Sequence, residues 1–154
     1  MTDNDWPDEL RTIGAIRFAR RSANFTAAVR FYRELVGLPL YATFEGSYGS
    51  TGAIFGLPDS TLTFEIVAAT EPVAADGHDQ LCLYFPDAAA RDAATARLRA
   101  AGVTPVVSHP YWAASGAETY ADPDGREVVF APFVFGVNEP AASDDSGTHW
   151  TRPR

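Results

Sequence analysis

Hydrophobic and polar residues alternate along the chain in two successive patterns that share one order of elements. In the first pattern, the strand-like stretch IRFARRS (16–22) precedes apolar residues at helical spacing, namely Phe25, Ala28, Val29, Tyr32 and Val36. Asn24 or Ser22 is placed to cap this helix, and Gly37 to end it. Three strand-like stretches follow, separated by Gly- and Pro-containing turns: PLYATFE (39–45), GAIFGL (52–57) and TLTFEIV (61–67).

The same order of elements then recurs. QLCLYF (80–85) predicts a strand, and Asp87 is placed to cap a helix over 88–101 that Gly102 ends. A DPDG turn precedes the last of three further strand candidates: TPVVS (104–108), ETYAD (118–122) and REVVFAPF (126–133). Position 17 lies 48 residues before position 65, and position 80 lies 49 before position 129, which supports an internal repeat.

The chain is therefore predicted to contain two tandem β-α-β-β-β units. We call residues 13–70 the first unit and residues 78–135 the second unit, and we expect 13–135 to form one domain. Residues 1–12 are predicted to be an N-terminal tail, because they are polar and acidic. Residues 136–154 are predicted to be a flexible C-terminal tail, because they carry Pro, Ser, Asp and Gly without periodicity.

Strand alternation separates two faces in each unit. One set is apolar and is expected to pack under the helices: Ile16, Phe18, Leu62, Phe64, Ile66, Leu81, Leu83, Phe85, Val128 and Phe130. The opposite set mixes charged, polar and apolar residues: Arg17, Ala19, Arg21, Thr61, Thr63, Glu65, Val67, Gln80, Cys82, Tyr84, Glu127, Val129 and Ala131. Such a mixture predicts a concave, partly dry surface. Strand alternation places Arg20 on the face that packs under the helices, near the end of its strand, where we expect its side chain to bend out to solvent. Arg21 is expected at the edge of the concave surface.

Charge and composition exclude several classes of function. The chain has 154 residues, a formal charge of −8 and 46% hydrophobic residues, so it has material for a core but no basic footprint for nucleic acid. No apolar run is long enough to span a membrane, and no signal peptide is recognised. Cys82 is the only cysteine, which favours a cytoplasmic location and precludes an intrachain disulfide. The three histidines share no metal-ligand spacing.

The stretches NFTAAVRFYRELVGLPL (24–40) and DPDGREVVF (122–130), together with the repeated unit, resemble the vicinal oxygen chelate superfamily. That group includes glyoxalase I, the extradiol dioxygenases and the bleomycin-resistance proteins, and the resemblance covers residues 13 to 135. HPYWAASGAETYADPDG (109–125) also resembles a bacterial branch of it. The resemblance implies an α+β fold of two tandem βαβββ units, whose eight strands form a cup-shaped, barrel-like mixed sheet. It also implies a small-molecule ligand and a homodimer, with each cup formed within one chain or between two.

Enzymes of the superfamily hold a divalent metal with four ligands, and the resemblance places these positions at Arg17, Glu65, Gln80 and Val129. Only Glu65 keeps a metal-ligand side chain. Gln80 offers a weak amide oxygen, Val129 offers none, and Arg17 would repel a cation. We therefore expect no metal and no cofactor. His78 lies two positions before Gln80 in a turn, and a shift of register would bring it inward without changing Arg17 or Val129.

Arg17 and Glu65 are expected on neighbouring strands, and two interpretations remain open. Arg17 presents a guanidinium to an anionic or carbonyl-rich ligand that Glu65 orients, or the two form an ion pair that fills the metal position and binds nothing. Five aromatic residues are candidates either for stacking on a planar ligand or for plain packing: Tyr48, Phe55, Tyr84, Tyr111 and Trp112. His109 is a candidate acid or base, although a loop histidine without a role is the simpler interpretation. Cys82 is interpreted as a buried, inert thiol.

The first functional hypothesis is a metal-free protein that holds an aromatic or carbonyl-rich molecule without chemistry, as bleomycin-resistance proteins sequester antibiotics. Its ligand contacts would come from the concave set and nearby aromatics: Arg17, Glu65, Gln80, Tyr84, Trp112, Val129, Tyr48 and Phe55. The alternative is a lyase, isomerase or dioxygenase-type enzyme, either metal-free with Glu65 as base or metal-dependent. A third hypothesis is a structural or regulatory dimer with a vestigial cup.

Overall fold

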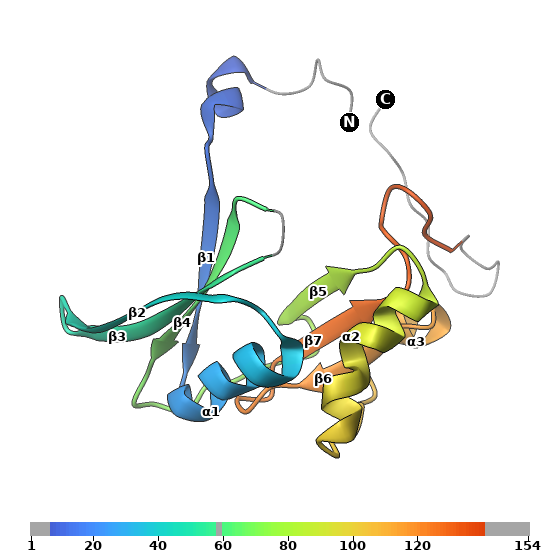
Figure 1. The fold of residues 1–154 in the computed structure, drawn as a ribbon. Helices are drawn as coiled ribbons and strands as arrows, with labels where there is room; N and C mark the ends of the chain where they lie inside the picture. Colours follow the sequence, from blue (N-terminus) through green and yellow to red (C-terminus); the bar gives the residue numbers. More distant parts are fainter. Residues whose placement is uncertain (1–6, 58–59, 141–154) are drawn as a thin grey trace.

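The computed structural model describes residues 7–57 and 60–140 (Figure 1). A short 3-10 helix, η2 (Asp8–Thr12), precedes the first unit and has no buried residues. The first unit contains β1 (Ile16–Ser22), α1 (Phe25–Arg30), η3 (Phe31–Val36), β2 (Leu40–Ser47), β3 (Ser50–Gly56) and β4 (Leu62–Ala68). The second unit contains β5 (Gln80–Tyr84), α2 (Ala88–Ala100), α3 (Pro110–Ala114), β6 (Glu118–Ala121) and β7 (Glu127–Ala131). Most of the predicted C-terminal tail, residues 141–154, lies outside the described residues.

Each unit forms its own mixed sheet, and the predicted α+β class is confirmed. The first sheet has the order β1-β4-β3-β2, and the second has the order β5-β7-β6. In both units the first strand runs parallel to the last, with Arg17 opposite Thr63 and Gln80 opposite Glu127. The strands that carry Arg17 and Glu65 are therefore neighbours, as expected. The edge strand β1 continues toward the N-terminus beyond the body of the molecule (Figure 1).

The second unit departs from the predicted pattern between its helix and its last two strands. Residues 103–109 form no strand, so the prediction for TPVVS is wrong, and the described residues contain seven strands instead of eight. Pro105 has no N–H to donate to a ladder, and only Val106 bonds to β6, through its N–H and the Thr119 carbonyl at 2.8 Å. The short helix α3 follows, with Pro110 in its first turn and the His109 Nδ1 accepting from the Tyr111 N–H.

Both long helical segments end where the sequence predicts. Gly37 adopts φ 88° and Gly102 adopts φ 75°, in the left-handed region that glycine tolerates best. The Asp87 side chain accepts the Ala90 N–H at 2.8 Å and so caps α2. The first helix reaches Val36 as predicted, but its second half, η3, is wound as a π-helix. Arg97 of α2 donates to the Val36 carbonyl at 3.1 Å, which joins the end of η3 to the second unit.

One hydrophobic core lies between the helices and the apolar faces of both sheets. Its fully buried centre includes Phe55, Phe64, Leu98, Val128 and Phe130. The ring of Tyr32 stands edge-on to Phe64, with ring centroids 4.9 Å apart. The predicted helix-side parity therefore holds for these strands, except that Ile16 stays 57% exposed at the start of β1.

A buried polar network crosses the junction between the two units. The Tyr32 hydroxyl donates to Asp122 Oδ2 at 2.7 Å, and Asp122 Oδ1 accepts the N–H groups of Asp124 and Arg126. Burial, followed by the charge of Asp122, raises the pKa of Tyr32 far above its usual value, so its hydroxyl remains a donor. Tyr32 of the FY pair and Asp122 of the DPDG turn are thus direct partners, which links the two sequence motifs in the structure.

Arg20 belongs to this network, and the expectation that it bends out to solvent is wrong. Only 9% of its side chain is exposed. Its guanidinium forms an ion pair with Asp79 at 3.0 Å, donates to the Tyr32 hydroxyl at 3.2 Å and lies 5.6 Å from the centre of the Phe64 ring. These partners replace water around the charge, so the arginine stays inside.

Candidate functional site

The first sheet presents a surface of mixed polarity on the face opposite its core, which we call the first inner face: Arg17, Ala19, Arg21, Ile54, Thr63, Glu65 and Val67. Arg17 lies 3.8 Å from Glu65 Oε2 and donates through Nε to the Thr63 hydroxyl at 3.3 Å. The Arg17 side chain is 53% exposed, whereas the Glu65 side chain is only 15% exposed. Arg17 and Glu65 therefore come together, and the guanidinium keeps donors available beyond this pair.

The second sheet has a corresponding second inner face, formed by Gln80, Cys82, Tyr84, Thr119, Glu127, Val129 and Ala131. Gln80 Nε2 donates to Glu127 Oε2 at 2.6 Å and to the Ser108 hydroxyl at 3.2 Å. Gln80 Oε1 accepts the Trp112 indole N–H at 2.9 Å. An indole nitrogen is only a donor, so this bond fixes which end of the amide faces Glu127. Gln80 and Trp112, both predicted site residues, are therefore in direct contact.

An aromatic cluster covers part of the second inner face. Trp112 lies over Val129 and Ala131, and it packs against Tyr111, Phe133 and Tyr84 with ring centroids 4.9, 6.4 and 6.3 Å apart. Tyr84 is 41% exposed, whereas Trp112 and Val129 are buried. Tyr84 is thus the member of the cluster that offers a ring to an incoming molecule.

Cys82 lies among these groups and is not activated. Burial first, and then the charge of Glu127, raise the pKa of its thiol to about 11, although Arg20 acts in the opposite direction. The thiol is therefore protonated near neutral pH, in agreement with its interpretation as an inert residue.

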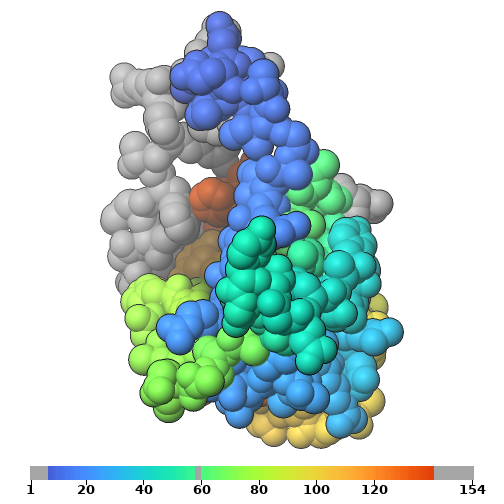
Figure 2. All heavy atoms as spheres, turned by 90° about the vertical axis from the view of Figure 1, so that its left-hand side faces the viewer, coloured from blue at the N-terminus to red at the C-terminus, as the bar shows by residue number. Residues whose placement is uncertain are grey.

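The structure separates Tyr48 and Phe55 from the other predicted ligand contacts. Tyr48 is fully exposed, with φ 48°, at the tip of the β2–β3 hairpin, which is nearest the viewer in Figure 2. Phe55 pairs in register with Phe64 and is completely buried in the core beside Tyr32. Phe55 therefore serves packing, because a ligand could reach its ring only by opening the core.

The two loop histidines lie near one another, with their rings 6.0 Å apart. His78 Nδ1 is 4.0 Å from Asp76, and its side chain is 86% exposed. His109 caps α3, which gives it a structural role that the sequence did not reveal. The third histidine, His149, lies outside the described residues.

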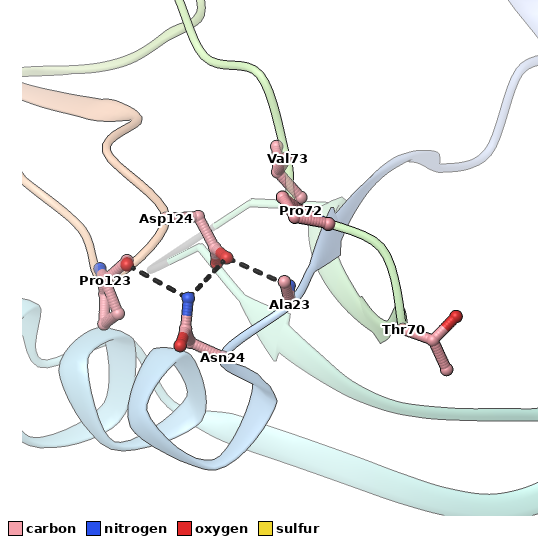
Figure 3. A pocket seen from close by; sticks show the side chains of 7 residues that line it. All are labelled: Ala23, Asn24, Thr70, Pro72, Val73, Pro123 and Asp124. Atoms are coloured by element: carbon pink, nitrogen blue, oxygen red, sulfur yellow. Dashed lines mark hydrogen bonds between the residues drawn. The ribbon is translucent and has the colours of Figure 1, made fainter.

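A surface pocket of about 330 Å³ lies at the junction of the two units. Figure 3 shows Asp124 bonded to the Ala23 N–H and to the Asn24 amide, which also reaches the Pro123 carbonyl. The remaining lining residues are Thr70, Pro72 and Val73. Because Asp124 accepts bonds from Ser22, Ala23 and Asn24, these polar groups fix the turn between β1 and α1.

The four positions that the resemblance assigns to metal ligands do not fit a metal. Arg17 points a cation at Glu65, both ends of the Gln80 amide are engaged by side chains, and Val129 is apolar and fully buried. Within residues 7–57 and 60–140, no three His, Cys, Asp or Glu side chains gather closely enough to hold a metal ion. The chemistry that these faces support is hydrogen bonding, charge pairing and stacking.

Two residues of the second inner face were not selected as site residues from the sequence. Strand alternation placed Glu127 on this face, but its partners Gln80 and Ser108 stand 47 and 19 positions away. Thr119 is 2% exposed, and its hydroxyl has no hydrogen-bond partner among the described residues. Alternation along the ETYAD stretch separates Thr119 from Glu118 and Tyr120, and this pattern could have identified Thr119 from the sequence.

The chain has two units that each contain a helix and a sheet with parallel first and last strands, and the inner faces mix polar and apolar residues. This arrangement defines a protein of the vicinal oxygen chelate superfamily. Residues 16–67 match the YycE-like N-terminal domain, and residues 79–132 match the YycE-like C-terminal domain. A curated relative, the protein YycE of Bacillus subtilis strain 168, is 34% identical over 120 residues, or 75% of this chain and 85% of the relative. The chain belongs to the YycE-like family.

Solved structures agree with this assignment. A YycE protein of unknown function from Bacillus subtilis superposes with a TM-score of 0.70 at 30% identity, over 80% of this chain and 91% of that one. FosX from Listeria monocytogenes, a fosfomycin resistance protein whose structure holds Mn(II), shares the fold at 12% identity, with a TM-score of 0.63 and coverage of 80% and 96%. TnmS3, an antibiotic binding protein from Streptomyces sp. CB03234, shares it at 24% identity, with a TM-score of 0.57 and coverage of 77% and 94%.

No helix in the part of the chain that the structure describes has the length and apolar character needed to span a bilayer.

A prediction about metal content follows from the replaced ligand positions. Purified protein, dialysed without chelator, is expected to contain far less than one equivalent of Zn, Ni, Mn or Fe per chain by mass spectrometry. Adding these ions is expected to leave the melting temperature unchanged, because binding to the native state alone would raise it. FosX is the matched control, since its structure holds Mn(II). A stoichiometric metal in this chain would contradict the prediction.

Proposed function

We propose that this chain binds a small planar molecule, bearing an acidic or carbonyl group, on its inner faces and without a divalent metal. The observation that carries the proposal is the Arg17 guanidinium. It occupies the position that the resemblance assigns to the first metal ligand, its side chain is 53% exposed, and Glu65 holds it from one side. A positioned cation takes over the part that a metal plays for an oxygen-bearing ligand.

The aromatic cluster supports the planar character of the ligand. Tyr84 offers a partly exposed ring, and Trp112 and Phe133 stack behind it with a 20° angle between their planes. Aromatic side chains arranged in this way favour flat molecules over flexible ones. TnmS3, an antibiotic binding protein, shares the fold. Sequestration of a flat antibiotic is the biological role that we propose for this site, and association into a homodimer stays a prediction.

Matched naphthalene probes test the proposal. Calorimetric titration of the full chain is expected to show that 1-naphthoic acid binds about tenfold more tightly than 1-naphthalenemethanol, because a charge-assisted hydrogen bond is the stronger kind. Arg17→Gln is expected to abolish this preference. Arg33→Gln removes an exposed charge from η3 and is the matched control, which should retain it.

Two outcomes would overturn the proposed function. The first is that neither probe binds the native chain. The second is that Arg17→Gln and Arg33→Gln reduce the binding of 1-naphthoic acid equally, because the guanidinium would then act only through net charge.

Catalysis is the second candidate, because the Glu65 carboxylate lies on the first inner face where it could accept a proton from a bound molecule. This lyase- or isomerase-type role predicts that Glu65→Gln keeps ligand binding and abolishes exchange of ligand C–H protons with D2O, observed by NMR. A binding protein without chemistry shows no such exchange in either form.

A further inference from the structure

Glu127 is held on the second inner face by two neutral donors. Both the Gln80 amide, at 2.6 Å, and the Ser108 hydroxyl, at 2.9 Å, bond to the same oxygen, Oε2. Among the described residues, no basic side chain forms an ion pair with Glu127, whereas Glu65 on the first inner face is paired with Arg17. The negative charge of Glu127 is therefore fixed in place without being neutralised.

The orientation of this carboxylate is set by a chain of hydrogen bonds. The Trp112 indole N–H takes up Gln80 Oε1, so the amide must direct its N–H groups toward Glu127 and Ser108. These bonds occupy Oε2 and leave Oε1 as the oxygen with no bond among the described side chains. A carboxylate supported in this way is preorganised to receive a donor.

The buried, unpaired hydroxyl of Thr119 is a second and independent observation that points to a ligand on the second inner face. The strand register aligns Thr119, Val129 and Cys82 in one row across the sheet, next to the row that holds Glu127 and Gln80. The Thr119 hydroxyl is buried and has no partner among the described residues. Because buried hydroxyls are nearly always hydrogen-bonded, an unpaired one calls for a missing partner.

Tyr84 completes the surroundings from the following row. It pairs in register with Ala131, and its half-exposed ring stands beside Trp112. The carboxylate and the free hydroxyl lie in adjacent rows and match an ammonium group better than an anion or a neutral carbonyl. Tyr84 lies two rows from Glu127, so its ring is placed for the planar part of the ligand.

We propose that the second inner face contains a subsite for an ammonium group of the ligand, in which Glu127 accepts the charged donor and Thr119 supplies a second polar contact. This inference rests on the proposed function, since it assumes that a planar ligand occupies the inner faces. It adds the chemical class of a second recognition element, an amine, to the acidic or carbonyl group that Arg17 recognises.

The test compares 1-naphthalenemethylamine with 1-naphthalenemethanol, which differ only in the group offered to Glu127. In low salt, the native chain is expected to bind the amine about tenfold more tightly than the alcohol. Added NaCl should lower the affinity for the amine and leave the affinity for the alcohol unchanged. Glu127→Gln is expected to remove the preference, so that the amine and the alcohol bind with about equal affinity. Glu71→Gln, which removes an exposed charge from the loop after β4, is the matched control and should retain it.

A second variant separates recognition from folding. Thr119→Val removes the unpaired hydroxyl while keeping the shape of the side chain, so it is expected to raise or maintain the melting temperature and to weaken amine binding about threefold. A purely structural role for Thr119 would leave amine binding unchanged.

The outcomes distinguish the two proposals. If the alcohol and 1-naphthoic acid bind but the amine is not preferred, or Glu127→Gln keeps the preference, the subsite is wrong and the proposed function stands. If no naphthalene probe binds the native chain, both are wrong.

Discussion

Asp122→Ala is expected to lower the free energy of unfolding by about 3–5 kcal/mol, because it leaves several buried donors without an acceptor. The carboxylate is 5% exposed and accepts the Tyr32 hydroxyl at 2.7 Å, the Asp124 N–H at 2.8 Å and the Arg126 N–H at 3.0 Å. Tyr32 itself is fully buried, so its hydroxyl cannot turn to water. Urea denaturation followed by circular dichroism measures the loss.

Two matched variants test whether the loss of stability in Asp122→Ala comes from its buried donors. Asp122→Asn keeps an oxygen for the two backbone donors and should cost clearly less than the alanine variant. Asp87→Ala removes an exposed capping carboxylate from α2 and should cost about 1 kcal/mol. If Asp122→Ala costs no more than Asp87→Ala, the junction network does not contribute to stability in the way proposed here.

The second large effect is a contrast between two arginines of β1. Arg20→Ala is expected to cost about 3 kcal/mol, because it breaks a buried ion pair with Asp79 and removes a donor to Tyr32. Arg17→Ala is expected to cost less than about 1 kcal/mol, because its pair with Glu65 is 3.8 Å long and half of its side chain is in solvent. The same urea titration measures both.

The cost of Arg20→Ala does not include a carboxylate left without any partner, because Asp79 has a second one. Arg126 Nε also bonds to Asp79, at 2.6 Å, so this carboxylate keeps one partner when Arg20 is removed. Arg20→Met retains the aliphatic part of the side chain and should recover part of the loss. Equal costs for Arg17→Ala and Arg20→Ala would contradict the burial that distinguishes them.

Features set by local alternation could be predicted from the sequence. The two units, the helix ends at Gly37 and Gly102, the cap at Asp87 and the faces of β1, β4, β5 and β7 all depend on residues a few positions apart. The proximity of Arg17 and Glu65 came from the resemblance, which supplied the order of the strands. These parts of the prediction agree with the structure.

Features that depend on distant partners could not be predicted. Arg20 stays buried because it forms an ion pair with Asp79 and a hydrogen bond with Tyr32. No sequence pattern close to Arg20 predicts these two partners. The face of Phe55 depends on the register between β3 and β4, which places it opposite Phe64 in the core. The valines at 106 and 107 favour a strand by propensity, but only one ladder bond is available to them.

The turn between β1 and α1 has a consequence for the order in which the chain becomes structured. Asp124 receives the Ser22 hydroxyl at 2.5 Å and the Ala23 N–H at 2.9 Å, whereas α2 is capped by its own neighbour, Asp87. During translation, Ser22 and Ala23 are synthesised about a hundred residues before Asp124. The turn between β1 and α1 therefore cannot complete its hydrogen bonds until the DPDG turn has been made. A nascent chain stalled before the DPDG turn should remain sensitive to protease near residue 23.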